Sequence, residues 1–148
     1  MPYFTYDTSV IISRKLIDFQ KIPRSFVMSA IVLMELMAGA DDRSRLKIYQ
    51  RFFRQCQKDN LLIVPNAEDW LLAAKIMYLL AQTRKRSQQG KLQRLPPGAS
   101  QRLALDVLIA VSARRWKAQV VTENWADFKA IQRYCDTKIV NAAKFFKK

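Results

Sequence analysis

The feature that most restricts how this chain can fold is the alternation of short apolar runs with longer segments of helical pattern. Strands are predicted from runs rich in aromatic and β-branched residues, at residues 3–6, 26–30, 61–64, 119–122 and 138–140. Helices are predicted over residues 8–19, 31–39, 41–59, 68–83, 101–116 and 125–134. Because strands that alternate with helices pair in one direction, the pattern predicts an α/β fold with a parallel sheet.

The length and composition favour one compact domain over residues 1–148. The chain has 148 residues, of which 50% are hydrophobic, and this is enough for one core and too little for two. Its 26 Lys and Arg outnumber its 12 Asp and Glu, which gives a formal net charge of +14. A charge excess of this size favours a polyanionic partner, with nucleic acid ahead of an anionic membrane surface.

Several kinds of site are excluded by residues that the sequence lacks or spaces widely. There is no histidine, so no imidazole can act as general base, zinc ligand or partner of a nucleophile. Cys56 and Cys135 form no CxxC or metal-ligand spacing and are predicted to be buried reduced thiols. No apolar run approaches the roughly 20 residues of a membrane helix, and Asp7 interrupts the first one. A cytoplasmic location and no membrane partner are therefore expected.

Two acidic residues lie inside helices that are otherwise strongly apolar. Glu35 is part of AIVLMELMAG and Asp106 is part of LALDVLIAVSA, and an Asp in the middle of a helix has poor propensity and cannot cap it. A carboxylate buried in such a helix must be paired, protonated or bound to metal. An ion pair with an arginine explains either residue alone about as well as a functional site does, and explains both together less well.

Two further acidic residues follow predicted strands. Asp7 can cap the helix after the first strand, and Asn124 can cap the helix at 125–134 with Asp127 in its first turn. Capping is the simpler explanation for each residue alone. Ligands of open parallel sheets, however, bind beyond the carboxyl ends of the strands. If the first and fourth strands are neighbours, these side chains face one crevice, and the helices that carry Glu35 and Asp106 can close on it.

Four carboxylates in one crevice describe a site for a hard cation. Oxygen ligands without nitrogen or sulfur suit Mg²⁺ or Mn²⁺. A divalent ion also removes the mutual repulsion that would raise the pKa of some of the carboxylates in an empty apolar pocket. Beside a basic surface, such an ion suits phosphodiester hydrolysis, because it activates water and neutralises phosphate charge. The candidate catalytic and metal-binding residues are Asp7, Glu35, Asp106 and Asp127.

With these acids in this order and spacing, the sequence resembles the PIN-domain ribonucleases, especially the VapC-like toxins of bacterial and archaeal toxin-antitoxin pairs. The resemblance extends over nearly the whole chain and rests on the motifs YDTSVI, SAIVLMELMAG, ALDVLIAVSA and VVTENWADF. It implies a three-layer α/β/α fold with a parallel sheet of about five strands in the order 3-2-1-4-5. It also implies an acidic Mg²⁺ or Mn²⁺ site that cleaves single-stranded regions of RNA.

The same resemblance implies roles for individual residues and partners. The metal ligands, direct or through water, would be the four acidic residues already named. The residues implied to orient or contact that shell are Thr8, Ser9, Thr122 and Asn124. The resemblance further implies a homodimer, a role as the toxin of a type II toxin-antitoxin pair, and inhibition by a small antitoxin protein that inserts a segment near the acidic pocket. The cleavage products would carry a 3′-hydroxyl and a 5′-phosphate.

The segment at 84–94 departs from the family pattern in its length and charge. Residues 84–100 are predicted as a loop, and the basic residues considered for RNA contact are Arg84, Lys85, Arg86, Lys91 and Arg94. A dimer or antitoxin contact, or a solvated helix end favoured by the helix dipole, explains them as well. The final AKFFKK is open in the same way, since Phe145 and Phe146 can simply pack against the sheet.

Two other functions remain open on the sequence. One is a catalytically inactive PIN-like module that binds RNA on the basic surface, and the presence of all four acids argues against it. The other is a phosphatase that uses Asp7 as nucleophile. It is disfavoured because Ser9 stands where a DxD motif has its second acid.

Overall fold

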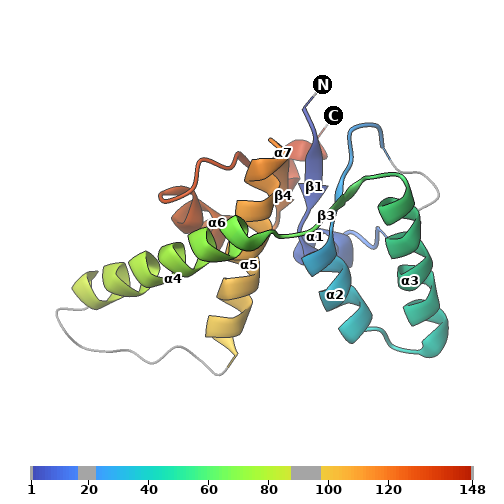
Figure 1. The fold of residues 1–148 in the computed structure, drawn as a ribbon, viewed down its shortest axis with the longest axis horizontal. Coiled ribbons are helices and arrows are strands. Elements are labelled where there is room, and N and C mark those ends of the chain that lie inside the picture. Colours follow the sequence, from blue (N-terminus) through green and yellow to red (C-terminus); the bar gives the residue numbers. More distant parts are fainter. Residues whose placement is uncertain (1, 17–22, 88–97, 148) are drawn as a thin grey trace.

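The computed structural model describes residues 2–16, 23–87 and 98–147, and Figure 1 shows their arrangement. The strands are β1 (Phe4–Tyr6), β2 (Met28–Ser29), β3 (Leu62–Ile63), β4 (Gln119–Thr122) and β5 (Ile139–Asn141). The helices are α1 (Thr8–Ser13), α2 (Ala30–Ala38), α3 (Arg43–Lys58), α4 (Ala67–Ser87), α5 (Ala99–Arg115), α6 (Trp125–Gln132) and α7 (Ala142–Phe145). The predicted alternation of strands and helices is therefore confirmed.

The described strands pair in parallel and follow the expected order. β4 pairs with β1 on one side and with β5 on the other, and β2 pairs with β3. A single parallel bridge between Phe4 and Phe26 joins the two groups, and the Val27 N–H donates to the Phe4 carbonyl there at 2.9 Å. The spatial order is β3-β2-β1-β4-β5, so the predicted α/β fold with a parallel sheet is confirmed.

Helices flank the strands on two sides. Figure 1 shows α2 and α3 on one side of the strands and α4 and α6 on the other. Strands covered in this way have apolar residues on both faces, as the sequence of β4 shows. The largest fully buried side chains include Met28, Leu33, Ile63, Ile76, Ile109, Phe128 and Ile131.

The register of β1 and β4 decides whether the candidate residues meet. Tyr6 lies opposite Val121, so Asp7 and Thr122 follow at the same edge of the sheet. The condition on which the predicted crevice depended, that the first and fourth strands are neighbours, is met.

The ends of two helices differ from the prediction. α1 ends at Ser13 rather than at residue 19, because Lys15 adopts a left-handed backbone conformation with φ of 52°; residues 17–19 lie outside the described part. α4 continues to Ser87, so the prediction of a loop from residue 84 was wrong for Arg84, Lys85 and Arg86. Arg and Lys are good helix formers, and the Thr83 hydroxyl holds this stretch to the Tyr134 hydroxyl at 2.7 Å.

The starts and ends of the last elements also differ in detail. The N-cap of α5 is Gly98, in the stretch predicted as a loop, with φ of 82°, which a glycine adopts without strain. α7 was not predicted. The aromatic residues near the C-terminus pack against the sheet, with the Phe145 ring 5.1 Å from that of Phe4 and the Phe146 ring 5.7 Å from that of Tyr6.

The state of the cysteines and the character of the helices bear on two predictions from the sequence. Cys56 and Cys135 are free and buried, as predicted. Among the helices of the described part, none combines the length and the apolar character that crossing a bilayer requires. The cytoplasmic location stays a prediction.

Candidate functional site

Asp7 occupies the corner between β1 and α1. Its backbone N–H extends the sheet by donating to the Val121 carbonyl at 3.1 Å. Its side-chain Oδ1 accepts from the Val10 N–H at 3.2 Å, as the N-cap of α1, and from the Ser9 hydroxyl at 2.6 Å. Asp7 is 3% exposed. This burial raises the pKa of Asp7, although hydrogen bonds from Ser9, Thr122 and Val10 oppose the shift.

Thr122 connects the end of β4 to Asp7. Its hydroxyl accepts from the Asn124 backbone N–H at 2.8 Å and donates to Asp7 Oδ2 at 2.6 Å. Thr122 is fully buried, so no water competes for that hydroxyl. A second link is formed by the Glu123 N–H, which donates to the Ser9 hydroxyl at 3.3 Å. Both oxygens of the Asp7 carboxylate are therefore held by groups that follow β1 or end β4.

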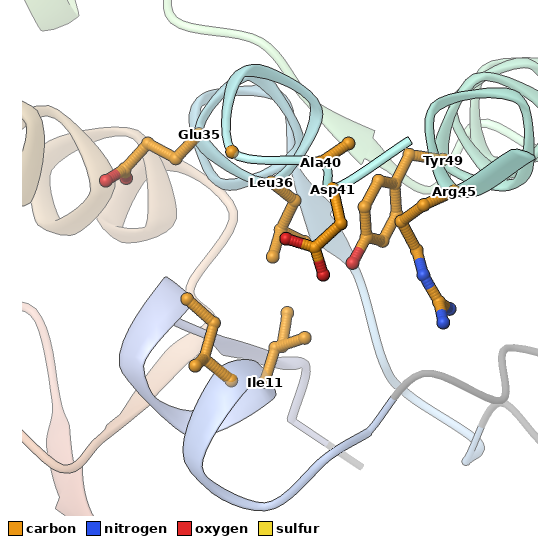
Figure 2. Close-up of a pocket in the computed structure, with 9 residues that line it drawn as sticks. Ile11, Glu35, Leu36, Ala40, Asp41, Arg45 and Tyr49 are labelled. Carbon is orange, nitrogen blue, oxygen red and sulfur yellow. The ribbon is translucent and has the colours of Figure 1, made fainter. Parts of the chain in front are cut away.

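Glu35 approaches the same corner from α2. Its Oε1 accepts from the Thr8 hydroxyl at 3.0 Å. Burial is the main cause that raises the pKa of Glu35; the Thr8 hydrogen bond opposes it, and the negative charge of Asp7 adds to it. Figure 2 shows the Glu35 side chain pointing toward α5, away from the other labelled side chains.

Asn124 joins the two remaining acids. Its side-chain amide donates to Asp127 Oδ2 at 2.9 Å and, more weakly, to Asp106 Oδ2 at 3.4 Å. Burial raises the pKa of Asp106 to about 7, and the negative charges of Asp7, Glu35 and Asp127 contribute to the increase. The four acids, from four separate segments of the chain, therefore act on one another electrostatically.

The four acids line one pocket of about 240 Å³, together with Thr8, Ser9 and Asn124. Thr122 lies behind Asp7 rather than in the wall of the pocket. The ion pairs in the described part of the chain are Arg14–Glu123, Arg114–Asp136 and Arg115–Asp69. None of them involves an acid of this pocket, so the alternative that Glu35 or Asp106 is neutralised by an arginine has no support among these residues.

The donor set of the pocket fits a hard divalent cation. Carboxylate, hydroxyl and amide oxygens line it, and these are the donors that Mg²⁺ and Mn²⁺ prefer. Burial is the main cause that raises the carboxyl pKa values of Asp7, Glu35 and Asp106, and the charges of neighbouring acids add to it at Glu35 and Asp106. A bound divalent ion would stabilise the charged forms of these carboxylates. Within residues 2–16, 23–87 and 98–147, the acids do not converge into a ready-made cluster of three or more metal-ligating side chains. The pocket therefore fits a hard cation by the type of its donor atoms.

Comparison with known proteins decides the family. The family model for the PIN domain matches residues 5–134, which contain all four acids. The chain belongs to the PIN domain family. No curated protein matches its sequence.

Three solved structures share the fold of this PIN domain at low sequence identity. VapBC-1 from nontypeable Haemophilus influenzae is 22% identical, with a TM-score of 0.55, and the match covers 95% of this chain and 98% of that one. DNA-bound VapBC from Salmonella typhimurium is 18% identical, with a TM-score of 0.56 and coverage of 96% and 99%. FitAB bound to an IR36 DNA fragment is 18% identical, with a TM-score of 0.55 and coverage of 94% of each chain.

One polar residue of the pocket in this PIN domain was not predicted from the sequence. Arg102 lines it, together with Ala99 and Leu103 from the first turns of α5. The available signal was the spacing, because residues four apart on a helix lie on the same face, and Arg102 precedes Asp106 by four.

A second pocket adjoins the acidic one through Glu35. This groove, of about 280 Å³, lies between α1, α2 and the start of α3. Figure 2 shows Ile11, Leu36 and Ala40 around it, with Asp41, Arg45 and Tyr49 along one side. We call it the apolar groove. Its position places a groove lined by apolar and charged side chains directly next to the acidic pocket.

The basic segment considered for RNA contact is only partly described. Arg84 is half-buried and Lys85 exposed on the last turns of α4. The backbone of Arg86 is helical, whereas Lys91 and Arg94 lie outside the described residues. The role of this segment in RNA binding stays a prediction.

Proposed function

We propose that this PIN domain is a Mg²⁺- or Mn²⁺-dependent endoribonuclease that cleaves single-stranded regions of RNA. The observation that carries the proposal is the pocket lined by Asp7, Glu35, Asp106 and Asp127, in which burial and mutual repulsion raise carboxyl pKa values. The net charge of +14 supports a polyanionic substrate. We further propose that residues 1–148 act as one domain.

The four acids would hold the metal ion, directly or through water. When bound, the ion would supply charge neutralisation at the phosphate and a more acidic water molecule. The water oxygen forms a bond to phosphorus, and the bond from phosphorus to the 3′-oxygen breaks. The leaving oxygen takes up the proton that water releases, so the products carry a 3′-hydroxyl and a 5′-phosphate.

The polar neighbours would keep the acids in position. Thr122 and Ser9 hold the two oxygens of Asp7 at 2.6 Å each, and Thr8 holds Glu35. Asn124 spans Asp106 and Asp127. Hydrogen bonds of this kind orient the side chains that bind a metal ion. Removing the partner residue typically lowers metal affinity or activity 10- to 100-fold.

The direct test combines calorimetric titration of Mn²⁺ with cleavage of a 5′-labelled single-stranded RNA. We expect saturable Mn²⁺ binding, cleavage that requires the ion and stops in EDTA, and products with 3′-hydroxyl ends. An RNA-binding module without catalysis would bind the RNA, ignore the metal and leave the strand intact. Trapping of a phosphorylated Asp7 would instead support the phosphatase.

We also propose that the protein is a toxin held inactive by a small antitoxin protein that docks in the apolar groove. The folds of VapBC and FitAB support this assignment, and Glu35 connects the groove to the acidic pocket. The homodimer implied by the resemblance stays a prediction.

The antitoxin proposal predicts a selective effect of one substitution in the groove. Ile12 lines the groove and is 66% exposed, so Ile12→Asp should abolish co-purification with a co-expressed small antitoxin protein without unfolding the chain. Val64 is 54% exposed and outside the groove, and Val64→Asp is the matched control. Equal recovery of the partner with both variants would contradict the proposal.

A further inference from the structure

Arg102 brings a positive charge to the wall of a pocket that is otherwise acidic. It lies in the first turns of α5, where its N–H donates to the Gly98 carbonyl at 3.1 Å. Its side chain lines the pocket with those of Asp7, Glu35, Asp106 and Asp127. The residue is also exposed, so it lines the pocket while remaining accessible to solvent.

This charge is not used to neutralise the pocket. The ion pairs within the described residues use Arg14, Arg114 and Arg115. Arg102 forms none with a described carboxylate, although Asp106 is four residues away on the same helix. Arg115 shows the contrast, because it is committed to Asp69 at 3.1 Å and to the Val64 carbonyl at 2.7 Å.

We propose that Arg102 is a substrate-binding residue that holds a phosphate of the RNA strand at the mouth of the acidic pocket. The inference rests on the proposed function and adds to it the group that receives the substrate. A phosphodiester that enters a pocket of four carboxylates is repelled until its charge is offset. The planar guanidinium presents paired N–H donors that match two phosphate oxygens. Among the described residues that line this pocket, Arg102 is the cationic one.

A purely structural role for Arg102 makes a different prediction. If the guanidinium only offset the carboxylates, its removal would lower the free energy of unfolding in EDTA and leave the affinity for RNA unchanged. If it holds a phosphate, its removal weakens RNA binding and leaves thermal stability nearly unchanged, because an exposed side chain contributes little to the core.

The experiment compares Arg102→Gln, Arg102→Lys and Arg51→Gln. Arg51 is an exposed arginine on α3 outside both pockets, and it serves as the matched control for the loss of one surface charge. Binding of a labelled single-stranded RNA is measured by fluorescence anisotropy in EDTA over a range of salt concentrations, so that no strand is cleaved. Cleavage is measured separately with Mn²⁺. The melting temperature is measured without RNA and without Mn²⁺.

We expect Arg102→Gln to raise Kd for RNA about tenfold, the effect of one lost charge-assisted hydrogen-bonding group. The slope of log K against log salt should fall by about 0.7, the value for one phosphate contact on a single strand. Arg102→Lys should restore the salt slope and only part of the cleavage rate, because a lysine offers a point charge rather than a fork. Equal Kd values for Arg102→Gln and Arg51→Gln would overturn the inference.

The two proposals fail in distinguishable ways. Absence of cleavage by the wild-type chain with Mn²⁺ would contradict the endoribonuclease, while the binding arm would still decide whether Arg102 contacts a phosphate. Normal cleavage with unchanged RNA affinity in Arg102→Gln would leave the nuclease standing and remove Arg102 from it.

Discussion

Asp7→Asn should reduce RNA cleavage by about 10²- to 10³-fold or more, the cost of removing one main electrostatic group from a catalytic site. Asn retains the size of Asp7 and can still accept from the Val10 N–H and the Ser9 hydroxyl, whereas the negative charge that would bind the metal is lost. Burial disfavours the charged form of Asp7, as its raised pKa shows, so loss of the charge should not destabilise the fold. We therefore expect the fold to persist and Mn²⁺ binding to weaken sharply.

The matched control for this variant is Asp136→Asn. Asp136 is exposed, lies outside the pocket and pairs with Arg114 on the surface, so its removal should leave cleavage and Mn²⁺ binding unchanged. Melting temperature and RNA anisotropy measured on both variants separate loss of chemistry from loss of fold or affinity. Wild-type cleavage rates in Asp7→Asn would rule out the proposed role of this carboxylate.

Asp106→Asn should stabilise the protein in EDTA above neutral pH while it abolishes cleavage. The pKa of Asp106 is about 7 in the folded chain and 3.8 ordinarily. A folded-state pKa that is raised means that the folded chain binds the proton more tightly than the unfolded one, so stability falls as pH rises between these two values. Each pKa unit corresponds to about 1.4 kcal/mol, and the loss for wild type is therefore up to about 4 kcal/mol.

Urea denaturation in EDTA at a series of pH values between about pH 4 and pH 8 measures this effect. Wild type should lose stability through this range, with Asp7 and Glu35 contributing in the same direction because their pKa values are also raised. Asp106→Asn should show a much flatter profile, and Mn²⁺ should stabilise it less than it stabilises wild type at the high end of the range. For the control Asp136→Asn, we expect the wild-type slope of unfolding free energy against pH. The same wild-type slope in Asp106→Asn would show that Asp106 is not buried among the other acids.

The strands and the identity of the acids were predictable for separate physical reasons. Buried parallel strands require apolar residues on both faces, so residues 119–122 could be read directly as β4. Glu35 and Asp106 stood out because an acid inside an apolar helix needs a partner. Helix ends were less predictable. The extension of α4 past Thr83 is accompanied by a contact to Tyr134, a residue 51 positions away in sequence.

Arg102 was missed in the sequence, because its four-residue spacing to Asp106 indicates only that the two residues share a face of one helix, and not which other segments pack against that face. Its neighbours in the pocket come from α1, α2, α5 and α6 and from the turns before α1 and α6. Only the packing of these segments shows that this arginine lines the acidic pocket while Arg115 is engaged by Asp69. The pKa of Asp106 has the same origin, since burial and three acids from other segments raise it.

The order of strands and helices, the excess of positive charge and the positions of four isolated acids were determined by the sequence alone, because propensity, periodicity and charge are properties of residues and of their local spacing. The tertiary structure decided which of these groups share a pocket, which are hydrogen-bonded and which cationic residue lines that pocket with them. Those properties depend on distances between segments up to 115 residues apart, as between Asp7 and Thr122. Such distances are set by the packing of the core around the sheet.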